Sequence, residues 1–340
     1  MTEPLLAVND LRVEFQSTER TVRAVRGLSY RMETGEALGI VGESGCGKSV
    51  SALALQRLLP TSAAKITSGQ VLFEGEDLTQ VSPTRIQDVR GSRIGMIFQD
   101  PLAFLNPVLT VGDQISESLR RHRGMDADAA TRRAEELLTA VGIPGAEQRV
   151  KDYPHQFSGG MRQRAMVAMA LACDPVLLIA DEPTTALDVT IQAQILDLIR
   201  QLREDQGMAL LLITHDLGVV AGITDRIAVM YAGRIVETGA TRELLKRPRH
   251  PYTQGLLQSL PRIDRPRESE LTPIEGSPPD LAADLVGCPF RPRCSNAIDR
   301  CATEDPPLVA DDGVGTGAGA GDVGRELACW SPVSAEGVDR

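Results

Sequence analysis

The sequence predicts an α/β protein in which helices cover both faces of a largely parallel β-sheet. Three short runs, residues 37–41, 176–180 and 209–213, are almost wholly apolar, which is typical of parallel strands that are buried on both faces. Between the second and third runs, apolar residues recur at helical spacing over residues 191–202, and Gly207 follows where a helix would end. Strands that alternate with helix-length connections favour a parallel sheet.

The remaining strand signals are weaker. Leu28, Tyr30 and Met32 alternate with polar residues, as in a strand with one buried face. Residues 94–98 form a further short apolar run in the middle of the chain. Residues 227–235 favour a β-hairpin, because two alternating apolar stretches flank an Ala-Gly pair.

Two parts of the chain depart from this pattern. Strand signals disappear over about residues 101–160, where helical periodicity at residues 111–121 and 132–141 predicts an inserted helical subdomain. Further along, prolines become frequent and clustered cysteines follow. We therefore predict a main domain over residues 1–247 and a small cysteine-rich C-terminal region over residues 248–340.

Charge and composition exclude several classes of protein. The chain has 36 Lys and Arg against 46 Asp and Glu, a formal net charge of −10, with 6 Phe, 4 Tyr and 1 Trp. Nucleic-acid binding needs a basic face or aromatic stacking platforms, so we expect no nucleic-acid partner. No apolar stretch approaches the ~18 residues of a membrane-spanning helix. The N-terminus lacks a signal-peptide pattern, which predicts a cytoplasmic location.

Residues 42–49 read GESGCGKS and match the phosphate-binding pattern G-x-x-x-x-G-K-[ST]. A predicted strand precedes the match and a predicted helix follows it, as the pattern requires. Glycines let backbone amides surround phosphate oxygens, and the helix N-terminus adds partial positive charge. We expect Lys48 to contact the β- and γ-phosphates of a bound nucleotide and Ser49 to bind Mg²⁺. The predicted phosphate-binding residues are Gly42, Glu43, Ser44, Gly45, Cys46, Gly47, Lys48, Ser49 and Val50.

Two carboxylates, Asp181 and Glu182, directly follow the apolar run at residues 176–180. A buried strand would carry them to the edge of the sheet, where Asp181 can hold Mg²⁺ directly or through water. Glu182 can then orient or polarise the attacking water. A solvated strand end is the alternative, and the phosphate-binding pattern favours the catalytic interpretation.

The segment FSGGMRQR distinguishes among the nucleotide-binding classes that share these features. Ser158, Gly159 and Gly160 open an apolar helical run, so a hydroxyl and a helix N-terminus form a second candidate anion site. This element resembles the signature SGG-x-x-Q of the ATP-binding cassette (ABC) family, with Gln163 at the last position. The resemblance covers roughly residues 5–245. It implies the ABC ATPase fold: a mostly parallel core sheet, an N-terminal antiparallel β subdomain and a helical subdomain.

The resemblance implies roles for further residues. Gln99 would lie close to Mg²⁺ and the attacking water, His215 would contact the γ-phosphate, and Asp188 would lie at a dimer interface. Phe15 is at the position of the adenine-stacking aromatic residue, with a core phenylalanine as the alternative. Cys46 stands where serine is common, and we expect it to retain function while adding sensitivity to thiol reagents.

Residues 97–115 and 249–261 resemble segments of the oligopeptide/dipeptide and related nickel importers, in their D-type ATP-binding subunit. This implies an ATPase at the cytoplasmic face of the membrane that powers peptide uptake by ATP-driven dimerisation. Its implied partners are a second homologous ATPase, two transmembrane permease subunits and a solute-binding protein. A homodimer, nickel or another solute, and a soluble ABC ATPase without a transport role are the alternatives.

Four cysteines, Cys288, Cys294, Cys301 and Cys329, have the spacing C-x5-C-x6-C-x27-C. In a reducing compartment, clustered cysteines favour metal binding over disulfides. The spacing matches neither the close pairs of structural zinc sites nor the ferredoxin patterns, so it leaves a cluster, zinc, and unliganded thiols or a disulfide open. The importer resemblance implies a [4Fe–4S] cluster on these four residues.

Overall fold

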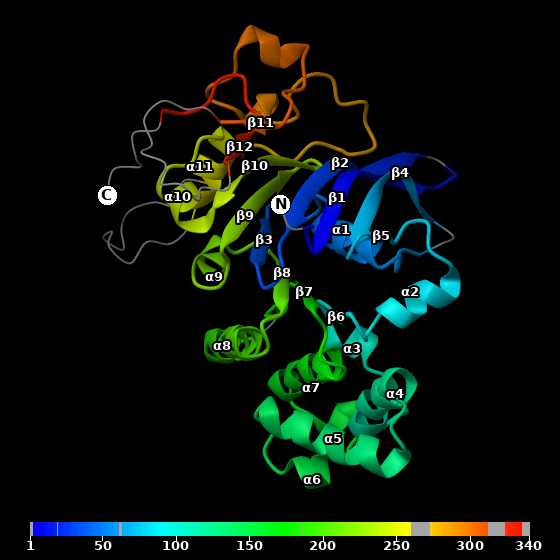
Figure 1. The fold of residues 1–340 in the computed structure, drawn as a ribbon. Coiled ribbons are helices and arrows are strands. Elements are labelled where there is room, and N and C mark those ends of the chain that lie inside the picture. Colours follow the sequence, from blue (N-terminus) through cyan, green and yellow to red (C-terminus); the bar gives the residue numbers. More distant parts are fainter. Residues whose placement is uncertain are drawn as a thin grey trace. The chain divides into compact units, whose positions relative to one another are not determined.

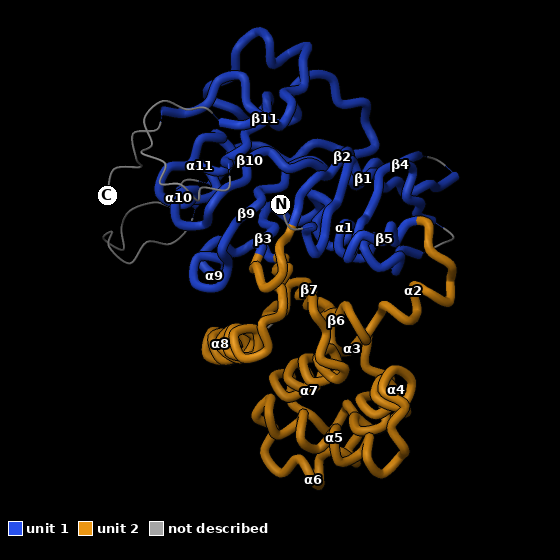
Figure 2. Tube along the Cα trace, in the orientation of Figure 1, with its two compact units in different colours: residues 1–31, 38–79, 214–340 blue, residues 32–37, 80–213 orange. Residues whose placement is uncertain are grey.

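The structure is a computed structural model, which describes residues 3–18, 20–60, 63–185, 187–259, 273–311 and 324–334. It divides into two compact units, each assembled from separate parts of the chain (Figure 2). Unit 1 contains residues 1–31, 38–79 and 214–340. Unit 2 contains residues 32–37 and 80–213.

An antiparallel sheet with the strand order β2-β1-β4-β5 forms the first part of unit 1 (Figure 1). Leu6 of β1 lies opposite Phe73 of β4, and the register between these strands shifts after Asn9. The shift occurs where Asp10 has a φ of 45°, so the strand carries a bulge there. The strands are β1 (Leu6–Gln16), β2 (Thr21–Met32), β4 (Ala64–Phe73) and β5 (Glu76–Asp77).

The core of unit 1 contains β3 (Ala37–Val41), which is buried along its whole length and runs parallel to β9 (Arg226–Tyr231). β9 forms an antiparallel hairpin with β10 (Arg234–Ala240). Ala232 and Gly233 connect them with φ angles of 47° and 79°, as in a type I′ turn, whose twist matches that of the flanking strands. The hairpin predicted over this region is confirmed.

The C-terminal region extends this sheet, which the sequence patterns do not indicate. β12 (Glu326–Leu327) pairs antiparallel with β10, and β11 (Val309–Ala310) pairs with β12. Arg325, next to β12, forms an ion pair with the buried Glu237 of β10. The helical segments of unit 1 are α1 (Lys48–Leu55), α9 (Leu217–Ala221), α10 (Thr241–Lys246), α11 (Pro251–Gln258) and the 3₁₀ turns Arg291–Arg293 and Asp299–Ala302.

Unit 2 contains three neighbouring parallel strands, β6 (Ile94–Ile97), β7 (Leu177–Asp181) and β8 (Ala209–Thr214). Every residue of these strands is buried, as the apolar runs predict. The predicted α/β class with mostly parallel core strands is therefore confirmed.

Helices make up the rest of unit 2, where α4, α5 and α7 pack against one another (Figure 1). Polar residues cap them: Thr110 accepts a backbone hydrogen bond at the start of α4, and Asp126 does so at the start of α5. The helical segments are α2 (Pro83–Val89), α3 (Pro101–Phe104), α4 (Val111–Arg123), α5 (Ala127–Ala140), α6 (Ala146–Arg149), a 3₁₀ turn (Pro154–Gln156), α7 (Gly159–Leu171) and α8 (Val189–Gln206). Across the described ranges, no helix is both long enough and apolar enough to cross a membrane.

Candidate functional site

The predicted phosphate loop connects β3 to α1 in unit 1. α1 begins at Lys48, and its N-cap residue, Gly47, has a φ of 103° and no side chain that could take the first helical amides. An anion at this helix end would be stabilised by those amides and by the helix dipole. Ser44 and Gly45, at the tip of the loop, are exposed.

Two glycines of the loop are required by close backbone contacts. A Cβ atom on Gly42 would lie 2.2 Å from the carbonyl oxygen of Met230, and one on Gly47 would lie 2.2 Å from that of Ala24. Any other residue would clash there. A Cβ atom on Gly45, by contrast, would have no neighbour within 4 Å among the described residues. The two ends of the loop therefore pack closely against the rest of unit 1, whereas its tip at Gly45 does not.

Lys48 is buried, with 4% of its surface exposed. Its ammonium group donates to the carbonyl oxygens of Gly42, at 2.7 Å, and of Glu43, at 3.0 Å. The Lys48 side chain therefore lies back along the loop, where its charge is available to a bound phosphate group.

Cys46 is a buried residue of the loop, and its carbonyl oxygen accepts a hydrogen bond from the backbone amide of Gly233 at 2.9 Å. Burial raises the pKa of the Cys46 thiol, although Lys48 acts in the opposite direction. Because the thiolate is the reactive form, these surroundings disfavour the reactivity toward thiol reagents that the sequence suggested.

Glu43 joins the loop to the C-terminal part of unit 1. Its carboxylate is bound by the guanidinium of Arg293, and its backbone amide donates to the hydroxyl of Tyr252 at 2.9 Å. Neither partner can be predicted from the sequence, because each is more than 200 residues away and no local pattern marks it.

In unit 2, Gln99 and Glu182 lie together at the ends of β6 and β7. The amide nitrogen of Gln99 donates to Oε2 of Glu182 at 3.0 Å, and the hydroxyl of Thr185 donates to the same oxygen at 2.8 Å. Asp181 is the last residue of β7 and, like Glu182, is buried. No pattern in the sequence marks Thr185 as a site residue.

The backbone at Glu182 is strained. Its φ of 45° is in the left-handed region, which a non-glycine residue adopts at a cost on the order of 1 kcal/mol. The backbone amide of Glu182 donates to the carbonyl of Ile213 at 2.8 Å, which holds the residue in this conformation. Strain of this kind is typical of functional sites.

The SGG segment begins α7. Ser158 is the N-cap residue and accepts a hydrogen bond from the amide of Met161 at 3.3 Å. A Cβ atom on Gly160 would lie 3.1 Å from Ile191, whereas a Cβ on Gly159 would have no neighbour within 4 Å in the described part of the chain. Gln163 is buried, and its amide nitrogen has no hydrogen-bond partner among the described residues.

The other predicted residues occupy separate positions. Asp188 is the N-cap residue of α8, where its carboxylate accepts a hydrogen bond from the amide of Ile191 at 2.9 Å. Phe15 is a half-buried residue of β1 opposite Ala64, and His215 directly follows β8.

Two protein families match separate segments of the chain. Residues 25–185 match the family described as ABC transporter. Residues 236–301 match the family described as oligopeptide/dipeptide transporter, C-terminal region.

Curated relatives are similar over almost the whole chain. The dipeptide transport ATP-binding protein DppD of Bacillus subtilis is 53% identical over 88% of this chain and 89% of its own length. The chain belongs to the ABC transporter family. The oligopeptide transport ATP-binding protein OppD of Bacillus subtilis is 52% identical to this ABC protein over 89% of this chain and 85% of its own length. The OppD protein of Salmonella typhimurium is 48% identical over 97% of this chain and 94% of its own length.

Solved structures agree with this assignment. The dimeric structure of the bacterial ABC transporter cassette MJ0796 matches with a TM-score of 0.63 at 28% identity, over 70% of this chain and 99% of that chain. The predicted ABC ATPase fold is therefore confirmed, and the chain is an ATPase of the transport-coupled type. ABC ATPases use ATP and Mg²⁺, and the hydroxyl, amide and carboxylate oxygens of Ser49, Gln99 and Asp181 are ligands that suit Mg²⁺.

The predicted [4Fe–4S] cluster is wrong. Within the described residues, which include Cys288, Cys294, Cys301 and Cys329, no group of three or more His, Cys, Asp or Glu is arranged to hold a metal ion. The zinc alternative fails for the same reason. The four thiols form no disulfide, and burial raises the pKa of Cys329.

Proposed function

We propose that this ABC ATPase powers the uptake of oligopeptides or dipeptides by a membrane importer. The observation that carries the proposal is the similarity of 88% of the chain to a protein named for dipeptide transport, together with the match of residues 236–301 to the C-terminal region of oligopeptide/dipeptide transporters. The ATPase fold alone could not support a solute class, because importers of many solutes share it.

In the proposed nucleotide site, the loop amides and Lys48 bind the phosphates of ATP. The ammonium of Lys48 now donates to two loop carbonyls, and a γ-phosphate oxygen would accept a hydrogen bond from its third N–H group. Ser49, Gln99 and Asp181 would hold Mg²⁺, which neutralises charge on the β- and γ-phosphates. Since the amide nitrogen of Gln99 is bound to Glu182, its oxygen is the atom suited to the metal.

Glu182 is the proposed base for hydrolysis. The hydrogen bonds from Gln99 and Thr185 fix the orientation of its carboxylate, so that it can orient the attacking water and accept its proton. His215 would donate a hydrogen bond to the γ-phosphate, and Phe15 would stack on the adenine.

A second ATPase subunit would complete each site. Ser158, Gly159, Gly160 and Gln163 of one subunit would contact the γ-phosphate of ATP held on the other, and Asp188 would lie at their interface. ATP would therefore hold two subunits together, and hydrolysis would remove the contact. The sequence signature supports this role, and Ser158 and Gly159 are exposed at the start of α7.

The proposed assembly contains a second homologous ATPase, two transmembrane permease subunits and a solute-binding protein. The chain would bind the permeases peripherally, at the cytoplasmic face of the membrane. The relatives named as transport ATP-binding proteins support permease partners. The acidic charge of −10 supports the expectation that nucleic acid is not a partner.

Uptake by proteoliposomes tests the proposal. The chain would be assembled with its cognate permeases, partner ATPase and solute-binding protein, and ATP would be supplied on the side of the ATPase. We expect accumulation of a labelled dipeptide or oligopeptide, and none when this chain carries Glu182→Gln. Accumulation of radioactive nickel without peptide would overturn the peptide assignment. ATPase activity without any permease association would overturn the transport role.

A further inference from the structure

The C-terminal region contacts the phosphate loop through a buried ion pair. Arg293 follows Glu43 by 250 residues, yet its two terminal nitrogens donate to the two carboxylate oxygens of Glu43 at 2.7 and 2.9 Å. The side chain of Arg293 is 4% exposed and that of Glu43 is 25% exposed. A bidentate pair fixes the orientation of both groups as well as their separation.

Other groups hold the guanidinium of Arg293 in place. Its Nε atom donates to the carbonyl of Glu275 at 3.0 Å, and its Nη1 atom lies 3.4 Å from the hydroxyl of Tyr231. The rings of Tyr231 and Phe290 each have their centroid 5.9 Å from the guanidinium carbon, within the range of cation–π attraction. Arg293 is therefore a fixed, charged group rather than a mobile surface side chain.

The backbone of Glu43 is also bound on both sides of its Cα atom. Its amide donates to the hydroxyl of Tyr252, and its carbonyl accepts from the ammonium of Lys48 at 3.0 Å. Tyr252 is fully buried and packs on Tyr231, with 4.5 Å between the ring centroids. The position of the Lys48 ammonium thus depends on Glu43, and that of Glu43 depends on Arg293 and Tyr252.

Arg293 also neutralises the negative charge of Glu43. Glu43 adds a negative charge to a loop that is proposed to bind a triphosphate, and the Arg293 guanidinium neutralises it at hydrogen-bond distance. Without Arg293 the carboxylate would repel phosphate groups, because the partly buried setting weakens screening by water.

We infer that Arg293 is a positioning residue of the nucleotide site, through which the C-terminal region sets the affinity of the loop for triphosphate. The inference rests on the proposed nucleotide site. It gives the C-terminal region a role in nucleotide binding that is separate from the choice of transported solute.

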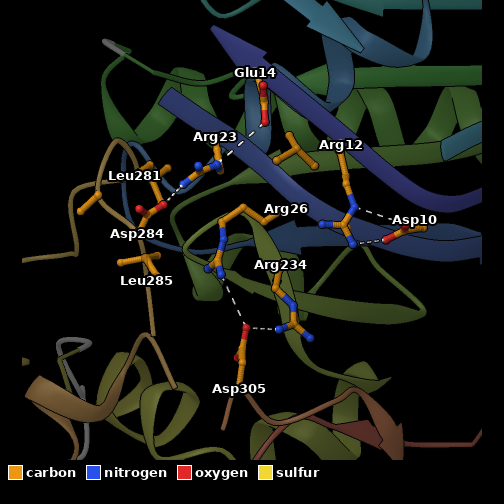
Figure 3. A pocket seen from close by; sticks show the side chains of 13 residues that line it. Asp10, Arg12, Glu14, Arg23, Arg26, Arg234, Leu281, Asp284, Leu285 and Asp305 are labelled. Carbon is orange, nitrogen blue, oxygen red and sulfur yellow. Dashed lines mark hydrogen bonds and ion pairs between the residues drawn. The ribbon is translucent and has the colours of Figure 1, made fainter. Parts of the chain in front are cut away.

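The C-terminal region contains a second ion pair that offers a control for the Arg293 variants. Figure 3 shows Arg23 of β2 paired with Asp284 and Arg26 paired with Asp305, around a pocket between β1, β2 and the C-terminal segment. The Arg23–Asp284 pair has a nitrogen–oxygen distance of 2.7 Å, and the Asp284 side chain is 87% exposed. Asp284→Asn therefore removes an ion pair of the C-terminal region without touching the loop.

Nucleotide titrations of the full chain in the hydrolysis-blocked Glu182→Gln background test the inference. We expect Arg293→Gln to weaken ATP binding about tenfold and Arg293→Lys to restore only part of the loss, because lysine keeps the charge but not the bidentate contact. Glu43→Gln keeps a side-chain oxygen that can accept a hydrogen bond from Arg293 but removes the carboxylate charge that repels phosphate, so it should tighten ATP binding about threefold. The double variant Glu43→Gln/Arg293→Gln should bind ATP better than Arg293→Gln alone, and Asp284→Asn should match the parent.

The effect should also grow with the number of phosphates, so AMP binding should change little in every variant. An Arg293→Gln variant that binds ATP as the parent does, or that loses ATP and AMP equally, overturns the inference. If Arg293→Gln does not fold, the Glu43→Gln variant tests the inference instead. ATP binding by Glu43→Gln that is equal to or weaker than that of the parent overturns the inference. Lys48→Ala distinguishes failure of the role inferred for Arg293 from failure of the proposed nucleotide site. Parental ATP binding in the Lys48→Ala variant would overturn the nucleotide site itself.

Discussion

The amide of Gln99 and the carboxylate of Glu182 are joined by a 3.0 Å hydrogen bond across 83 residues of sequence. β6 and β7 are adjacent parallel strands, so the residues that follow them meet at one edge of the sheet. Thr185 donates to the same carboxylate oxygen. The proposed base is therefore oriented by two donors, one of which belongs to a proposed Mg²⁺ ligand, so metal binding at Gln99 would also affect the orientation of the base.

Replacing Glu182 with Gln should stop hydrolysis while ATP still binds. The amide keeps the shape of the side chain but cannot accept the proton of the attacking water, so turnover should fall by about 10²- to 10⁴-fold. Phosphate release and nucleotide titration measure the two quantities separately. Glu204→Gln, on the exposed face of α8, is the matched control. A Glu182→Gln variant with parental turnover would contradict the assignment.

Replacing Lys48 with Ala should weaken ATP binding at least tenfold, because a charge-assisted contact to phosphate contributes about 1.5–3 kcal/mol. The same change at Lys65, an exposed residue of β4, should have no effect on binding. Titration with a fluorescent ATP analogue compares the two variants. Equal affinities for Lys48→Ala and Lys65→Ala would refute the proposed site.

Gly47→Ala should destabilise unit 1 more than Gly45→Ala does. Both glycines have positive φ, 103° and 80°, so both variants bear backbone strain. Only at Gly47 would the new Cβ lie 2.2 Å from a backbone oxygen, and relief of that clash should cost about 1–3 kcal/mol in addition. Urea unfolding of the two variants gives the difference. Equal midpoints would show that the loop relaxes without cost.

His250 should make the chain less stable at mildly acidic pH. Burial lowers the pKa of His250 to about 3, whereas an unfolded histidine titrates near 6.5. Below pH ~6.5 the unfolded chain therefore binds a proton that the folded chain does not, so stability falls as pH falls. Between pH 7 and 5 the loss should be about 2 kcal/mol.

His250→Asn isolates this contribution. His250 is the N-cap residue of α11, and its Nδ1 atom accepts the amide proton of Tyr252 at 3.0 Å. Asparagine can also cap a helix and does not titrate. Urea unfolding at pH 7 and 5 should show a smaller loss of stability in the variant. The same loss in both proteins would mean that other groups cause the acid sensitivity.

Local patterns in the sequence predicted the parts of the fold that depend on local physics. Wholly apolar runs located the parallel strands β7 and β8, and the Ala232-Gly233 pair located the β9–β10 hairpin. The phosphate-binding pattern likewise located the loop between β3 and α1, because strand, glycines and helix follow one another directly in the chain.

Features that depend on distant contacts could not be predicted in this way. Nothing near Glu43 or Arg293 in the sequence indicates that they pair, and no periodicity marks the two-residue strand β12. The cysteine prediction failed for a related reason. Spacing and family resemblance indicated four ligands, whereas ligation depends on the arrangement of the side chains in space, and no metal-binding group is found among the described residues.

The pairing of β12 with β10 sets an order for biosynthesis. While a chain is still being translated, β10 has an open edge until Leu327 leaves the ribosome, and exposed strand edges promote aggregation. Arg293 and Tyr252 also emerge about 200 residues or more after the loop that they hold. Nascent chains that stop before this point would therefore carry a complete GESGCGKS segment without its final support, and such fragments should be preferred substrates of chaperones and proteases.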